Sequence, residues 1–191
     1  MAYQYQSVWK KISPELITEL TDFWARENAL PKGAQPKRRA EQVAVVMRDD
    51  ADGSIVAVSS VIARVVPRLR QVLYYYRTFC AEKHRRNNTS IPIMQATQTA
   101  LRDYNLGLPK PEAIGIIVEI ESTYINQRYP EAFWPATMFS FIGYSPRGLP
   151  VRVHYFTDFK LQPPVRIERT QGAAGNRAGA RAPARQRRRP N

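Results

Sequence analysis

The feature that most constrains this sequence is a strand, a helix and a second strand in succession near the middle of the chain. QVLYYYRTFC (71–80) predicts a strand, because β-branched and aromatic residues suit a pleated, half-buried surface. Apolar residues recur on one face from about Ser90 to Asn105, so a helix is predicted there, ended by Gly107 and Pro109. AIGIIVEIES (113–122) is apolar enough for a strand covered on both faces. Such a succession indicates a right-handed, parallel crossover.

The flanking segments predict that the rest of the sheet is largely antiparallel. Near the N-terminus, Ser13 as N-cap and Pro14 as the first helical residue open a segment whose apolar residues follow helical spacing. Residues 43–49 and 54–65 are β-branched strands around a DADG turn, and residues 138–156 predict a final hairpin. The expected fold class is α+β, with helices on both faces of a mixed, mostly antiparallel sheet.

Positive charge divides the chain into two regions. The net charge is +13, and residues 165–191 hold eight arginines and one glutamate, which leaves +6 for residues 1–164. Large apolar residues are almost absent from the end of the chain, so we expect one folded domain over 1–164 and a disordered basic tail over 165–191. The polar connection 30–42, which carries Arg39, is expected to be an exposed loop.

Cysteine, histidine and hydropathy exclude several other classes of protein. Cys80 is the single cysteine, so an intramolecular disulfide is excluded, and with only two histidines we expect no metal site. The N-terminus lacks the build of a signal peptide, and no apolar run approaches the length of a membrane span. We therefore expect a soluble, cytoplasmic protein that is not bound to a membrane.

The loop before the central helix concentrates hydrogen-bond donors. It lies within TFCAEKHRRNNTS (78–90), where Arg85 and Arg86 precede two asparagines. A helix N-terminus offers unpaired N–H groups and the positive end of the helix dipole, and neighbouring arginines add charge-assisted hydrogen bonds. The segment is a candidate phosphate site, and a solvated basic turn is the alternative.

This loop and the order of elements resemble the GNAT superfamily of acyl-CoA-dependent N-acetyltransferases over roughly residues 3–160. In that family a Gln/Arg-x-x-Gly-x-Gly/Ala loop opens the helix and holds the pyrophosphate of coenzyme A. The resemblance implies that the same role falls to Arg85, Arg86, Asn87, Asn88, Thr89 and Ser90. Asn88 and Ser90 replace the small glycines, but Asn tolerates left-handed backbone, and Ser is small and can cap the helix. The resemblance also implies that the pantetheine arm pairs with the backbone of Phe79, Cys80 and Ala81.

Two glutamates of the second strand are candidate bases for acyl transfer. Transfer to an amine requires a base for the ammonium proton, and often an acid for the departing thiolate. Glu119 and Glu121 are two residues apart and so share a face in an apolar segment, which is expected to raise the pKa of a carboxyl. Glu121, nearer the end of the strand, is the preferred base. The alternatives are an ion pair with Arg77 and a solvent-exposed Glu121.

The resemblance implies a tyrosine as the acid. GNAT enzymes commonly carry it in a pattern resembling Asn-x-x-Ala-x-x-x-Tyr after the fifth strand. In NQRYPEAF, Asn126 matches the asparagine and is implied in cofactor binding, but Phe133 stands where the tyrosine is expected. Tyr124 or Tyr129 would then act from a shifted position, and Pro130 predicts that no regular helix runs through the segment.

Two functions follow as expectations. The resemblance implies an N-acyltransferase that moves an acetyl group from acetyl-CoA, or from another acyl-CoA, to an amine of a small molecule or protein that remains unspecified. The alternative is a GNAT-like scaffold without catalysis, whose tail, Arg177–Arg189, holds nucleic acid or another polyanion. A solubilising tail and a homodimer are also left open.

Overall fold

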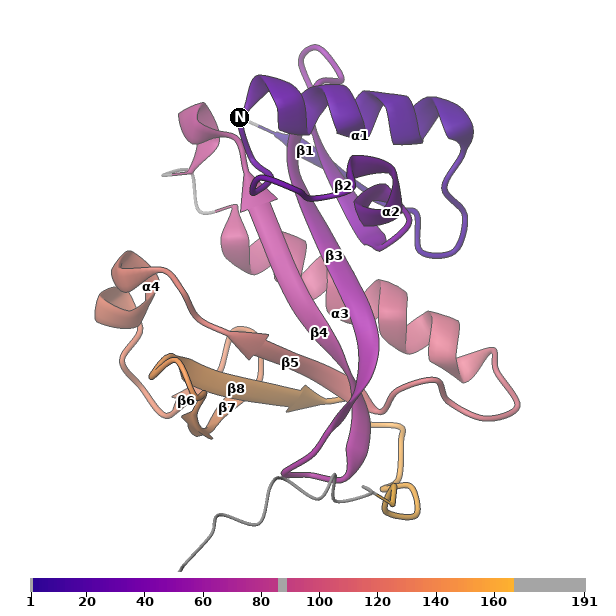
Figure 1. Ribbon diagram of the computed structural model, residues 1–191, viewed down its shortest axis with the longest axis vertical. Coiled ribbons are helices and arrows are strands. Elements are labelled where there is room, and N and C mark those ends of the chain that lie inside the picture. The colour runs from indigo at the N-terminus through magenta and orange to yellow at the C-terminus, as the bar shows by residue number, and fades with distance from the viewer. Residues whose placement is uncertain (1, 86–88, 167–191) are drawn as a thin grey trace, which may run out of the picture.

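The computed structural model describes residues 2–85 and 89–166 (Figure 1). Three predicted cofactor residues (Arg86, Asn87 and Asn88) and the Arg177–Arg189 tail therefore lie outside the described residues. The elements in chain order are β1 (Tyr3–Ser7), α1 (Pro14–Arg26), α2 (Pro36–Ala40), β2 (Val43–Asp49), β3 (Ile55–Val66), β4 (Gln71–Cys80), the 3-10 helix η1 (Glu82–His84), α3 (Ser90–Leu106), β5 (Gly115–Glu119), α4 (Thr123–Arg128), β6 (Phe133–Trp134), β7 (Phe139–Tyr144) and β8 (Pro150–Tyr155).

The strands form one mixed sheet in the order β1-β2-β3-β4-β5-β8-β7-β6. Neighbouring strands are antiparallel except β4 and β5, which pair in parallel at Tyr74–Ile116 and Tyr75–Ile117. Helix α3 connects these two strands, so the predicted parallel crossover and the α+β fold class are confirmed.

Helices cover both faces of the half of the sheet that contains β1 to β4 (Figure 1). On one face, Val46 and Val58 pack in a buried cluster with Leu20 and other residues of α1. On the other face, Val45 and Ile93 of α3 belong to a separate buried cluster. This two-sided packing follows from the strand period, because successive side chains of β2 point to opposite faces.

Helix α1 begins as the sequence predicts, whereas α2 was missed. The Ser13 hydroxyl accepts a hydrogen bond from the Leu16 N–H at 3.3 Å, and Pro14 is the first helical residue. The expectation of a loop over 30–42 was wrong at its centre, where Pro36–Ala40 forms a short helix that buries Ala40 completely. Five residues are too few to show helical periodicity in a sequence.

The sheet opens where β4 and β5 diverge. The two strands pair only through Tyr74 and Tyr75 of β4, whereas the Ile120 N–H beyond β5 donates to the Pro150 carbonyl at 2.9 Å and so stays with β8. Within the described chain, β4 from Tyr76 to Cys80 therefore pairs with a strand on its β3 side alone. The divergence is visible in Figure 1 as a V between β4 and β5.

Within residues 2–85 and 89–166, no helix combines the length and the apolar character that crossing a membrane requires.

Candidate active site

A cavity of about 1100 Å³ lies between the diverging ends of β4 and β5. Its wall is formed by β4 from Tyr75 to Phe79, the first turn of α3, residues 118–122 after the β4–β5 pairing, and the segment 129–137. Residues of α1, α2 and the connection between them complete the wall. A large, mostly apolar cavity with a few charged groups is the usual form of a small-molecule site.

The first turn of α3 reaches the cavity, but its cap differs from the prediction. Ser90 and Ile91 line the cavity. The N-cap is Thr89 rather than Ser90. The backbone of Thr89 is already helical, and its hydroxyl does not cap the helix but lies 3.4 Å from the Cys80 sulfur. Because Pro92 has no N–H, Ser90 and Ile91 supply the backbone donors of this turn.

Arg85 is turned back onto β4. Its Nε donates to the Cys80 carbonyl at 3.1 Å, and its guanidinium lies 5.6 Å from the centre of the Phe79 ring. Arg85 itself is exposed and does not line the cavity.

The part of β4 that borders the cavity lies a few residues before the backbone edge predicted for pantetheine. Of the three predicted residues, Phe79 lines the cavity. However, the Cys80 carbonyl accepts from Arg85, and the Ala81 N–H donates to the Val56 carbonyl at 2.8 Å, so both groups already have partners. The cavity instead borders Tyr76–Phe79, the part of β4 beyond its pairing with β5. The Cys80 side chain is half-buried, and burial raises the pKa of its thiol.

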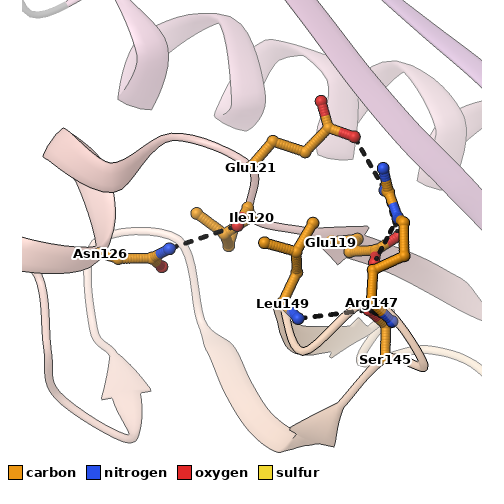
Figure 2. Close-up of polar contacts among 7 residues, drawn as sticks. All are labelled: Glu119, Ile120, Glu121, Asn126, Ser145, Arg147 and Leu149. Atoms are coloured by element: carbon orange, nitrogen blue, oxygen red, sulfur yellow. Dashed lines mark hydrogen bonds and ion pairs between the residues drawn. The ribbon is translucent and has the colours of Figure 1, made fainter.

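Glu119 and Glu121 both line the cavity, and both bind the same arginine (Figure 2). Arg147 donates to the two Glu119 oxygens at 3.2 and 2.8 Å and to Glu121 Oε1 at 2.8 Å. These hydrogen bonds are the main cause that lowers the pKa of Glu119, so the expectation of a raised pKa was wrong for this residue. The ion-pair partner of both glutamates is Arg147, in the turn between β7 and β8, instead of Arg77. Glu121 lies beyond the end of β5, and its side chain is 69% exposed.

The segment after β5 brings one predicted tyrosine to the cavity. Tyr129 lines the cavity and meets the Trp134 ring edge-to-face with centroids 6.0 Å apart. Tyr124 is 69% exposed and lies outside the cavity wall. Asn126 also lies outside it, because its side-chain amide donates to the Ile120 carbonyl at 3.3 Å and ties α4 to the strand end (Figure 2). Helix α4 ends at Arg128, two residues before Pro130.

Three further polar residues of the cavity wall were not predicted as site residues. Tyr76 is buried, and within the described chain its hydroxyl has no partner at hydrogen-bond distance and angle; burial raises its pKa. Arg39 of α2 and Arg77 of β4 also line the cavity. Burial, and then the charge of Arg77, lower the pKa of Arg39. The tyrosine run and the basic run 37–39 were visible in the sequence, but neither shows that these side chains reach one cavity.

No group of three or more histidines, cysteines, aspartates and glutamates that could hold a metal ion occurs in the part of the chain that the structure describes.

The sequence matches no family model and no curated protein sequence, whereas the structure is similar to solved acetyltransferases. A ribosomal-protein-S5-alanine acetyltransferase from Vibrio fischeri superposes with a TM-score of 0.58 at 10% identity, over 83% of this chain and 95% of that chain. A GNAT superfamily phosphinothricin acetyltransferase from Sinorhizobium meliloti, solved with AcCoA, gives 0.54 at 12% identity, over 86% and 96%. A GCN5-related N-acetyltransferase from Kribbella flavida gives 0.53 at 14% identity, over 81% and 98%. The fold of this chain is therefore the fold of GNAT acetyltransferases.

Proposed function

We propose that this protein is an acyl-CoA-dependent N-acyltransferase that transfers an acetyl group to an amine. The observation that carries the proposal is the V between β4 and β5, with the first turn of α3 on the same cavity. An extended ligand can pair with the backbone of a strand edge while its phosphates approach a helix N-terminus. The phosphinothricin acetyltransferase with this fold was solved with AcCoA, which supports the same ligand class here.

In this proposal the pantetheine arm lies along Tyr76–Phe79, and the pyrophosphate approaches the loop that ends at Thr89 and Ser90. The backbone donors of Ser90 and Ile91 and the positive end of the α3 dipole would favour the phosphates. Arg85 could contribute only by leaving the Cys80 carbonyl, to which it now donates.

The reaction requires two proton movements besides acyl transfer. The neutral amine nitrogen attacks the thioester carbonyl carbon, a C–N bond forms, and the C–S bond breaks to release the thiolate of coenzyme A. Glu121, exposed at the cavity wall, is our candidate to take the amine proton, and Tyr129 our candidate to protonate the thiolate. Tyr124 is less suited to this step, because it lies outside the cavity wall.

Isothermal titration of the full chain with acetyl-CoA tests the cofactor site. We expect saturable binding, and we expect Ser90→Trp to weaken it at least about tenfold, because a large side chain would fill the approach to the first turn of α3. Thr99→Trp is the matched control, since Thr99 is exposed on the same helix and does not line the cavity. Absence of binding by the wild-type chain at millimolar acetyl-CoA would contradict the proposed function.

Turnover is measured as thiol release from acetyl-CoA in the presence of a panel of amines. We expect release that depends on both the amine and the enzyme. Acetyl-CoA binding without any amine-dependent release would favour a scaffold that binds the cofactor and has lost catalysis.

A further inference from the structure

We infer that the acceptor of this enzyme is an amine that also carries an anionic group, a carboxylate or a phosphate, and that Arg39 and Arg77 bind this group. The inference rests on the proposed function, because it concerns the second substrate of the same cavity. It is carried by the position of the two arginines and by the finding that, in the part of the chain that the structure describes, neither forms an ion pair with a carboxylate.

The two arginines lie on the face of β4 that α1 and α2 cover. Along a strand, alternate residues share a face, so Arg77 lies on the same side as Tyr75 and Phe79. Phe79 identifies that side, because its ring meets Phe23 of α1 with centroids 5.8 Å apart. Arg39 reaches the cavity from α2, on this same side of the sheet (Figure 1).

The opposite face of β4 belongs to α3. Tyr76, the neighbour of Arg77, shares a buried cluster with Met94 of α3. The first turn of α3, where the pyrophosphate is proposed to bind, is thus on the other side of the β4 edge from Arg77. A ligand that lies along the edge would meet the acceptor on the α1 and α2 side.

The charges of the cavity wall leave these two guanidiniums without acidic partners. Glu119 and Glu121 are bound to Arg147. Glu131 is the third carboxylate of the cavity wall, and in the described part of the chain it forms no ion pair with either arginine. Among residues 2–85 and 89–166, none of the ion pairs includes Arg39 or Arg77. The contact made by Arg39 is a long hydrogen bond, 3.5 Å, to the side-chain oxygen of Gln42.

Two neighbouring guanidiniums repel each other, and an anion that lies between them offsets this repulsion. Arg77 is close enough for its charge to act on Arg39, and Arg39 is half-buried, which strengthens the repulsion. A guanidinium presents a planar set of donors that matches the oxygens of a carboxylate or phosphate, so an anionic group would satisfy both side chains at once. A neutral substituent at this place would leave both charges without an anionic partner.

The test compares pairs of amines that differ in the anionic group. Glycine is compared with methylamine, β-alanine with propylamine, and phosphoethanolamine with ethanolamine, at saturating acetyl-CoA and with thiol release as the readout. We expect the anionic member of at least one pair to have a kcat/KM at least about tenfold higher, as hydrogen bonds to charged groups contribute strongly. The carboxylate and phosphate pairs show which anion is preferred.

The double variant R39Q/R77Q should abolish this preference, mainly by raising KM for the anionic amine. It should leave the Kd of acetyl-CoA unchanged, because the pantetheine arm is proposed to pair with the backbone of β4, which the substitution keeps. Arg38→Gln is the control on α2, because Arg38 loses one positive charge, as Arg39 does, but does not line the cavity. Titration of each amine into the complex with coenzyme A reads acceptor binding without turnover.

The outcomes separate this inference from the proposed function. If the wild-type chain does not bind acetyl-CoA, both the function and the inference fail. If acetyl-CoA binds, three results would overturn the inference alone. The first is that neutral and anionic amines are bound and used equally, or that neither is bound. The second is a preference for the anionic amine that survives in the double variant, and the third is a loss of acetyl-CoA affinity in the double variant, which would assign the arginines to the cofactor.

Discussion

Arg147 is the main cause of the lowered pKa of Glu119. Its Nη2 lies 2.8 Å from Glu119 Oε2, and this contact holds the pKa of the carboxyl below its ordinary value. Replacing Arg147 with methionine removes the positive charge and keeps an unbranched side chain, so we expect the pKa of Glu119 to rise toward the ordinary value of about 4.3. Carboxyl-carbon NMR over a pH titration measures this shift. Arg38→Met, on an exposed residue of α2, is the control and should leave the titration of Glu119 unchanged.

The same ion pair predicts the sign of a pH effect on stability. Because the folded-state pKa of Glu119 is depressed, its contribution to stability is present above the unfolded-state value and is lost as the pH falls through the lower, folded-state value. The wild-type chain should therefore exceed R147M in free energy of unfolding at neutral pH, and the difference should shrink on acidification. A difference that stays constant down to pH 2 would show that Arg147 stabilises the fold in some other way.

At the scale of elements, Asn105 joins the end of α3 to the start of β5. Its side-chain oxygen accepts from the N–H groups of Glu112 and Ala113 at 2.7 and 3.1 Å, and its amide nitrogen donates to the Tyr74 hydroxyl at 2.9 Å. Asn105 is 1% exposed, so no water can replace these contacts without rearrangement. We expect Asn105→Ala to lower the free energy of unfolding by about 3 kcal/mol, because it leaves polar groups without partners, one of them deeply buried.

Urea denaturation measures the effect of Asn105→Ala. Leu106→Ala is the matched control on the next residue of α3, since Leu106 is 50% exposed and its truncation should change stability by no more than about 0.5 kcal/mol. Equal effects of the two substitutions would contradict the role given to Asn105.

The sequence predicted the elements whose residue types or periodicity extend over many residues. Strand β4 carries enough β-branched and aromatic residues, and helix α3 enough helical spacing, to be placed within a residue or two. The five-residue α2 has no such pattern, and so the sequence did not show that Arg39 reaches the cavity. Arg147 was missed as the partner of Glu119 for another reason. The pairing of β5 with β8 brings the two residues into contact, and the spacing of residues along the chain does not show which distant strands pair.

At the scale of the whole molecule, the order of elements was more informative than any single motif. Solved acetyltransferases share this fold at only 10 to 14% identity, so few residues are needed in common to specify it. In this chain the order of elements produces a short parallel pairing of β4 and β5, followed by divergence around a cavity. The site residues depend instead on individual side chains, such as Tyr129 inside the cavity wall and Tyr124 outside it.

The distribution of charge over the whole chain leads to the last prediction. Six of the arginines lie in residues 170–191, and residues 1–164 carry +6. We propose that the tail binds single-stranded RNA or another polyanion, and that deleting residues 170–191 weakens this binding. The slope of log affinity against log salt should fall by about 0.7 for each arginine that contacts a phosphate.

A full-length chain with these six arginines changed to glutamine is the matched control and should behave like the truncated chain if charge, not length, is responsible. Fluorescence anisotropy with a labelled oligonucleotide measures both quantities, and acetyl-CoA titration checks that the cavity is intact. RNA affinity that is unchanged by the truncation would place polyanion binding on the basic body of the protein instead.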